Sequence, residues 1–248
     1  MLRLVWYLFL SLVLSTSIVF SQTSVPDSVF IREHYIKYEY QIPMRDSVKL
    51  FTAVYVSKDT SELHPILLTR TPYSVGPYGA DEYIKFLSNL TRQYIQRNYI
   101  IVYQDVRGRF MSEGTFVDVR PYIPQKKNNK DIDESSDAYD TIDWLIKNIN
   151  RNNGRVGVKG ISYLGFYTTM ATISAHPAVK ATSPQAPVSA WMLGDDFNHN
   201  GALLFPHAFD FLMGFGWPRP EPTTKDFRKF DHGTPDGYKF YLYTYKHQ

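Results

Sequence analysis

The sequence predicts an α/β fold with a mostly parallel sheet and helices on both faces. Two observations predict it. Short apolar runs resemble buried central strands, and they alternate with segments whose apolar residues recur at helical spacing. Because strand and helix alternate, each crossover returns the chain to the same sheet and its strands run parallel. The chain has 248 residues, of which 44% are hydrophobic and 21% charged, as in ordinary globular proteins.

The expected elements follow in chain order. Residues 46–57 form a half-buried strand, because apolar and polar residues alternate there from Val48 to Val56. Short apolar runs predict buried strands at 65–69, 99–103, 156–159 and 179–182. Apolar stripes at helical spacing predict helices at 80–97, 136–150 and 164–175.

The N-terminus has the composition of a secretory signal peptide. Residues 1–21 start Met-Leu-Arg, continue through an almost wholly apolar stretch from Leu4 to Phe20, and end at Ser21. An uncleaved membrane anchor is the other interpretation, because the stretch approaches spanning length. A Ser-Thr-Ser interruption at 15–17 favours the signal peptide. We therefore expect cleavage after Ser21, export to the periplasm or beyond, and no stable membrane association afterwards.

Composition excludes several classes of protein and site. There are no cysteines, which excludes a thiol nucleophile, a disulfide scaffold and a cysteine-ligated metal. The net charge of +3, from 27 basic and 24 acidic residues without a basic stripe, argues against nucleic-acid binding. No Gly-x-Gly-x-x-Gly fingerprint opens a predicted helix, so we expect no cofactor. The sequence leaves the formation of a homo-oligomer open.

Ser162 lies between the predicted strand 156–159 and the predicted helix 164–175. A serine flanked by small residues in this setting is typical of a nucleophile elbow. The tight turn exposes the hydroxyl and directs the next backbone N–H to the same place. The usual pattern has glycine two residues after the serine, whereas this chain has Leu164 there and Gly165 one residue later. The other interpretation is a helix N-cap, in which the serine only satisfies a backbone amide.

Residues 160–165, Gly-Ile-Ser-Tyr-Leu-Gly, resemble the elbow of the cocaine-esterase and X-prolyl dipeptidyl-peptidase (S15-type, CocE/NonD) serine hydrolases. That family's elbow has the same displaced glycine. Further resemblances occur in the same order at residues 69–73, 105–114 and 137–145, and residues 191–198 are similar to the α-amino-acid ester hydrolases. The resemblance covers about residues 44–245. It implies an α/β-hydrolase fold that cleaves esters or amides of α-amino acids or short peptides through an acyl-enzyme.

The resemblance also implies the oxyanion machinery. Ser162 would be the nucleophile, Tyr163 would donate its backbone N–H to the oxyanion, and Tyr73 would donate its phenol O–H as the second donor. A preorganised donor of this kind contributes on the order of 3 kcal/mol. The plainer interpretation of Tyr73 is a turn aromatic after Pro72 that packs on the core.

Asp196 matches the first of three carboxylates that bind the substrate's α-ammonium in the ester hydrolases, with Asp195 as the alternative if the register differs by one. A carboxylate facing an ammonium gives charge-assisted hydrogen bonds. The plainer interpretation is that one of these aspartates caps a helix opened by Phe197. Elsewhere, we expect Asp105, Arg107 and Glu113 to form a buried arginine–carboxylate network beside the site.

The acid and the histidine of this fold follow the nucleophile on later strands. The histidines after Ser162 do not suit that role, and residues 205–248 resemble the start of the family's helical cap. We therefore expect a signal peptide at 1–21, part of a hydrolase domain at 22–204 and the start of the cap at 205–248. The acid and histidine are expected beyond Gln248, so the chain alone would be an inactive N-terminal fragment. An X-Pro dipeptidyl peptidase and a non-catalytic, truncated binding relative are the alternatives.

Overall fold

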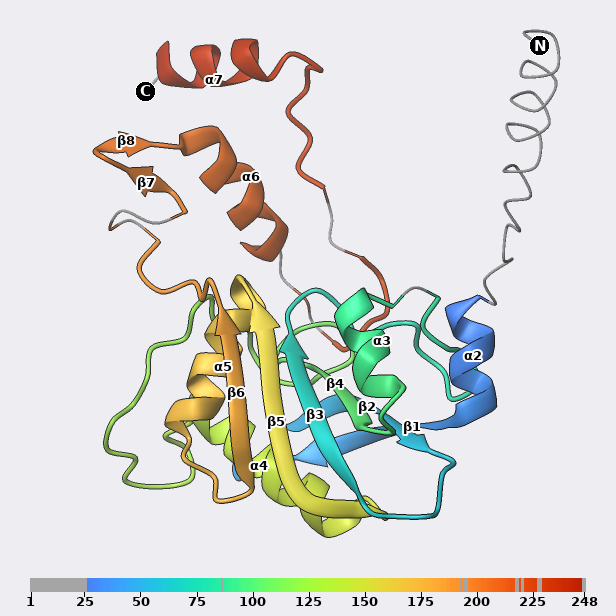
Figure 1. Cartoon of the computed structure of the whole chain (residues 1–248). Helices are drawn as coiled ribbons and strands as arrows, with labels where there is room; N and C mark the ends of the chain where they lie inside the picture. Colours follow the sequence, from blue (N-terminus) through green and yellow to red (C-terminus); the bar gives the residue numbers. More distant parts are fainter. Residues whose placement is uncertain are drawn as a thin grey trace, which may run out of the picture.

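The computed structural model describes residues 26–85, 87–191, 193, 196–216, 219, 221–226 and 229–246. Its main sheet has six strands in the order β1-β2-β4-β3-β5-β6 (Figure 1). The strand bounds are β1 Tyr35–Pro43, β2 Lys49–Ser57, β3 His64–Thr71, β4 Ile100–Asp105, β5 Asn152–Ile161 and β6 Val179–Gln185. β4, β3, β5 and β6 run parallel, while β2 is antiparallel to both of its neighbours, β4 and the edge strand β1. The predicted mostly parallel sheet is confirmed.

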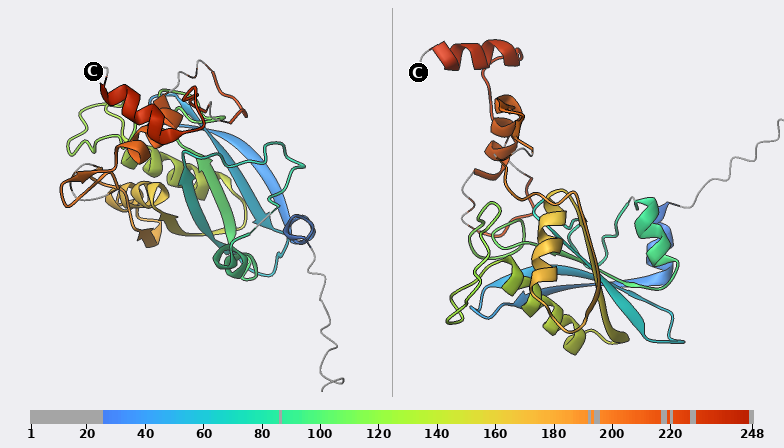
Figure 2. Two further views of the ribbon diagram at one scale, coloured as in Figure 1. Left: turned by 90° about the horizontal axis from the view of Figure 1, so that it is seen from above. Right: turned by 60° about the vertical axis from the view of Figure 1, so that its left-hand side comes forward.

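Helices cover both faces of this sheet (Figure 2). Their bounds are α2 Asp27–His34, α3 Asn89–Ile95, α4 Glu134–Asn148 and α5 Tyr163–Ile173. Leu50 and Val54 of β2 pack in the apolar cluster under α4 and α5, whereas Phe51 and Tyr55 pack in the cluster that includes α2 and α3. Successive strand residues point to opposite faces. β2, expected to be half-buried, is therefore buried on both sides.

The helix predicted at 80–97 is wrong over its first half, because the helix begins at Asn89. The hydroxyl of Ser88 accepts the backbone N–H of Thr91 at 3.1 Å, which caps the helix there. Ile84 and Leu87 pack against the core from the preceding loop rather than from a helix. The helical spacing of these two residues therefore reflects the burial of their side chains and not a helix. α2 and β1 were not predicted.

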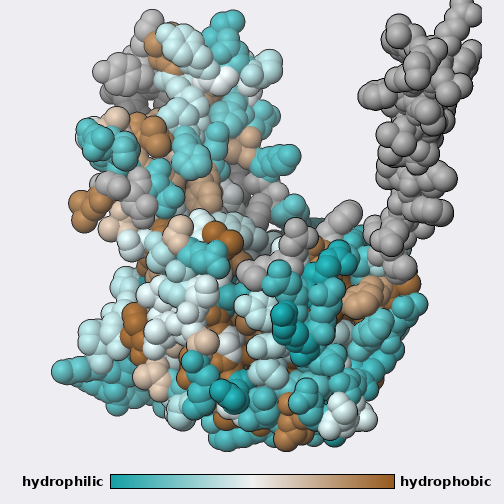
Figure 3. All heavy atoms as spheres, in the orientation of Figure 1, coloured by the Kyte–Doolittle hydropathy of each residue, from teal (hydrophilic) through white to brown (hydrophobic). Residues whose placement is uncertain are grey.

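The C-terminal part forms a hairpin of β7 Asn198–His199 and β8 Ala202–Leu203, followed by helices α6 Phe205–Gly216 and α7 Gly237–Lys246. No helix opens at Phe197, so the alternative interpretation of Asp195 or Asp196 as the cap of such a helix does not hold. α6 packs on the body through Phe211, whose ring centroid lies 5.4 Å from that of Trp191. The segment rises above the body and shows some hydrophobic residues on its surface (Figure 3). Phe205 and Tyr238, which belong to this segment, are exposed.

The expected signal peptide lies outside the described residues. Within the part of the chain that the structure describes, no helix combines the length and the apolar character needed to span a bilayer.

Candidate active site

Ser162 occupies a strained turn between β5 and α5, with φ 60° and ψ −121°. Such a conformation costs a non-glycine residue on the order of 1–3 kcal/mol and persists only where the surroundings impose it. The Ser162 N–H donates to the Gln185 carbonyl at the end of β6 (3.0 Å), and its carbonyl accepts from Phe166 (3.1 Å) and Val188 (3.4 Å). The side chain is exposed and makes no capping bond to α5. The helix-cap interpretation of Ser162 therefore does not hold.

Two glycines make this turn sterically possible. A Cβ on Gly160 would lie 2.2 Å from the Leu164 carbonyl oxygen, and one on Gly165 would lie 2.6 Å from the Gln185 carbonyl oxygen. Both distances are shorter than any real carbon–oxygen contact. The glycine is needed three residues after Ser162 because the first turn of α5 presses there against the end of β6.

Tyr163, the first residue of α5, is fully buried. Its backbone N–H has no partner within the helix, since the first N–H groups of a helix never do. Its phenol donates to Asp118 Oδ1 at 2.6 Å and accepts the Val119 N–H at 2.9 Å. Its ring meets that of Tyr73 edge-on, with centroids 6.2 Å apart. The structure therefore brings Tyr73 to the elbow.

Tyr73 follows β3 and is 42% exposed, so its phenol is not simply a core aromatic. Burial raises the pKa of Tyr73 to about 12; the charges of Asp118 and Asp196 act in the same direction and that of Arg109 opposes them. The phenol is therefore a proton donor at neutral pH. Both carboxylates therefore act electrostatically on this phenol. Asp195, the alternative to Asp196, lies outside the described residues.

Asp118 and Arg109 were not singled out from the sequence. Burial raises the pKa of the half-buried Asp118, while the Tyr163 hydrogen bond and the charge of Arg109 lower it. Arg109 is buried and donates to the Pro72 carbonyl at 3.2 Å, next to Tyr73. Burial lowers its pKa to about 10. Asp118 and Tyr163 are 45 positions apart, so no local motif indicates their contact.

The expected arginine–carboxylate network forms with different partners. Arg107 is buried and pairs with Asp137 at 2.7 Å and with Asp46 at 2.7 Å. Asp105 instead accepts the Val75 N–H, and Glu113 accepts the backbone N–H of Lys49, both at 2.9 Å. The prediction was right about Arg107 and wrong about its carboxylates.

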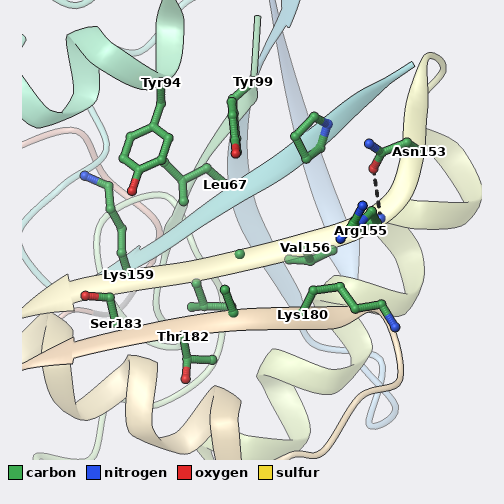
Figure 4. Close-up of a pocket in the computed structure, with 14 residues that line it drawn as sticks. Leu67, Tyr94, Tyr99, Asn153, Arg155, Val156, Lys159, Lys180, Thr182 and Ser183 are labelled. Atoms are coloured by element: carbon green, nitrogen blue, oxygen red, sulfur yellow. Dashed lines mark hydrogen bonds between the residues drawn. The ribbon is translucent and has the colours of Figure 1, made fainter. Parts of the chain in front are cut away.

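Two hollows lie in this part of the molecule. One, of about 350 Å³, is next to the elbow and is lined by residues 118, 119, 189–191 and 193. The other, of about 430 Å³, runs along β5 and β6 below α3. There Lys159 of β5 and Tyr94 of α3 point toward each other (Figure 4), and the Lys159 ammonium lies 5.8 Å from the Tyr94 ring centre. This second hollow ends at Lys159 and Ser183, and Ser162 lines neither of the two hollows.

No histidine among the described residues hydrogen-bonds to Ser162. His176 follows α5, at the opposite end from Ser162, and its Nε2 lies 3.8 Å from Asp143. His232 bonds to Asp210 of α6 at 2.9 Å. In the described ranges, no group of three or more His, Asp or Glu side chains is placed to hold a metal ion.

A mostly parallel sheet in which one of the parallel strands, β5, ends in a strained, exposed serine at the start of a buried helix defines an α/β-hydrolase. The family described as X-Pro dipeptidyl-peptidase (S15 family) matches residues 46–245 of this sequence. The chain therefore belongs to this family of serine hydrolases.

Individual relatives agree with this assignment. The cocaine esterase of Rhodococcus sp. (strain MB1 Bresler) is 33% identical over 166 residues, which is 65% of this chain and 25% of the esterase. An aminopeptidase from a marine sediment archaeon (Thaumarchaeota archaeon) and an α-amino acid ester hydrolase are each 34% identical, with TM-scores of 0.73. Each match covers 92% of this chain, and 37% and 36% of those structures respectively. The chain thus spans well under half the length of these relatives.

Proposed function

We propose that this protein is an exported serine hydrolase that cleaves esters or amides of α-amino acids or short peptides through an acyl-enzyme on Ser162. The observation that carries the proposal is the backbone of Ser162: a strained serine with positive φ at a strand–helix turn leaves its hydroxyl exposed and without a capping bond, as a nucleophile elbow does. Export is proposed on the composition of residues 1–21. We also propose that residues 22–204 belong to the hydrolase domain and 205–248 to the start of its cap.

The proposed reaction is acyl transfer to and from Ser162. Its Oγ attacks the acyl carbonyl carbon and loses its proton to a histidine base, and the carbonyl oxygen becomes an oxyanion. The Tyr163 N–H and the Tyr73 phenol donate to that oxygen. The alcohol or amine leaves with a proton from the base, and water then hydrolyses the acyl-enzyme. In this fold the acid and the base follow the nucleophile in the chain.

The proposed substrate class rests on charge at the site. The charge of Asp196 acts on the Tyr73 phenol and raises its pKa. An α-ammonium on the acyl group would there form a charge-assisted bond while its carbonyl points to Tyr73. Two relatives at 34% identity are an aminopeptidase and an α-amino acid ester hydrolase. An X-Pro dipeptidyl peptidase is the second candidate, on the family's description alone.

A serine-directed fluorophosphonate probe tests the nucleophile in the full-length gene product. We expect the probe to label the wild type and Ser189→Ala, but not Ser162→Ala. Ser189 is the matched control, because it is an exposed serine that lines the hollow of about 350 Å³ next to the elbow. Labelling that persists in Ser162→Ala, or no labelling of the wild type, would refute the proposal. Cleavage of alanyl-proline p-nitroanilide but of no amino-acid ester would favour the dipeptidyl peptidase.

A further inference from the structure

The hollow beside the elbow has walls that are bonded to the elbow itself. On one side, Asp118 accepts the phenol of Tyr163 at 2.6 Å. On the other, Ser189 follows Val188, whose N–H donates to the Ser162 carbonyl. Ser162 itself does not line this space of about 350 Å³, so a group that enters it is joined to the elbow through Asp118, which is bonded to Tyr163, and through Ser189, which follows Val188.

The lining of the hollow combines a carboxylate with an aromatic face. Asp118 uses Oδ1 for Tyr163, and among the described residues its Oδ2 makes no further hydrogen bond. Trp191 lines the same hollow and is stacked on Phe197 at 4.6 Å, which holds the indole in place. A carboxylate near an aromatic ring suits an organic cation, through a charge-assisted bond and a cation–π contact.

Asp118 and Asp196 both act on Tyr73. Two negative charges near an oxyanion donor disfavour the negative charge that develops there during acyl transfer. The positive charge of Arg109 offsets part of this negative charge, since it lowers the pKa of Tyr73 while the two carboxylates raise it. An acyl group with two cations would neutralise the remainder, one cation for each carboxylate.

We propose that Asp118 is a specificity-determining residue that selects acyl groups carrying a second cation on their side chain, such as lysyl groups. The inference rests on the proposed function, in which Ser162 is acylated and Asp196 binds the α-ammonium. It adds that the hollow between Asp118 and Trp191 receives the side chain of that acyl group.

Three methyl esters with the same six-carbon acyl chain separate the two carboxylates. Hexanoate has no ammonium, norleucine has the α-ammonium, and lysine adds a terminal ammonium. We expect kcat/KM of the full-length wild type to be about tenfold or more higher for lysine than for norleucine. Asp118→Asn, which keeps an acceptor for Tyr163 and removes the charge, is expected to abolish this ratio. Asp196→Asn is expected to lower the ratio of norleucine to hexanoate instead.

Two further variants distinguish charge from structure. Tyr163→Phe removes the phenol and leaves the Asp118 charge. It should therefore keep the ratio of kcat/KM for the lysine ester to that for the norleucine ester, even if both values fall. Glu62→Gln removes an exposed charge from the loop between β2 and β3 and should change neither ratio. Equal rates for lysine and norleucine in the wild type, or an unchanged ratio in Asp118→Asn, would overturn the inference and leave the proposed function standing. Hydrolysis that survives Ser162→Ala, or no hydrolysis of any ester, would overturn both.

Discussion

The carboxylate of Asp105, at the end of β4, accepts the backbone N–H of Val75 at 2.9 Å. Val75 lies two residues after Tyr73. The same carboxylate accepts the Tyr78 phenol at 2.9 Å and the Met111 N–H at 3.2 Å, and it is completely buried. A single buried side chain thus joins the loop that carries the predicted oxyanion donor to the loop that follows β4.

This burial makes the stability of the protein depend on pH. Burial raises the pKa of Asp105 to about 7, although hydrogen bonds from Tyr78, Met111 and Val75 lower it. A folded pKa above the unfolded value of about 3.9 means that the folded state binds the proton more tightly. The stability contributed by this group is complete below about pH 4 and is lost as the pH rises through about 7.

Asp105→Asn tests this dependence, because asparagine does not ionise. We expect the free energy of unfolding of the wild type, relative to the variant, to fall between about pH 4 and 7 with a slope of up to about 1.4 kcal/mol per pH unit. Chemical denaturation of both proteins across that range measures it. Other carboxylates are common to the two proteins and cancel. A difference that does not change with pH would contradict the prediction.

Tyr73→Phe should reduce kcat with little effect on stability, if the phenol donates to the oxyanion. Loss of one such donor typically lowers kcat by about 10²–10³-fold. Because the pKa of Tyr73 is raised to about 12, the phenol stays protonated and the loss should be the same at about pH 7 and 9. Tyr238→Phe, which alters a phenol on a 75% exposed residue, is the control for a general effect. An unchanged kcat would exclude Tyr73 from the oxyanion site.

The strain at Ser162 can be measured by comparing two variants that lack its hydroxyl. Glycine tolerates φ 60°, whereas alanine does not. We expect Ser162→Gly to be more stable to chemical denaturation than Ser162→Ala by about 1 kcal/mol or more. At Ser189, whose φ is not positive, we expect the opposite: Ser189→Ala should be more stable to chemical denaturation than Ser189→Gly. If alanine were as stable as glycine at Ser162, the turn would not be strained.

Gly165→Ala should destabilise the protein by about 3 kcal/mol, because the added methyl would overlap the Gln185 carbonyl and lie 3.0 Å from Pro187 Cα. Gly214→Ala is the matched change in a helix with open space around it, and it should be neutral or stabilising by about 0.5–1 kcal/mol. Thermal unfolding of the two variants gives the comparison. Equal effects would show that the contact between α5 and β6 tolerates a side chain.

Much of the fold could be predicted because its signals are local. The apolar runs of β3 and β4 and the apolar stripes of α4 and α5 lie within continuous segments, and each was expected close to its observed bounds. β5 was expected over 156–159 but begins four residues earlier and ends two residues later. Ile84 and Leu87 show where such reasoning fails. A loop buried their side chains at the same spacing that a helix would have used.

By itself, the sequence determined the strand, the turn and the helix around Ser162, because Gly160 and Gly165 permit a close approach that few other sequences allow. Family resemblance added Tyr73 and Asp196 as proposed site residues. Only the tertiary structure decided which charges meet: Arg107 with Asp46 and Asp137, and Asp118 with Tyr163. These partners are 30 to 61 positions apart. Their contacts depend on how loops cross the ends of the strands, and no local pattern of residues specifies that path.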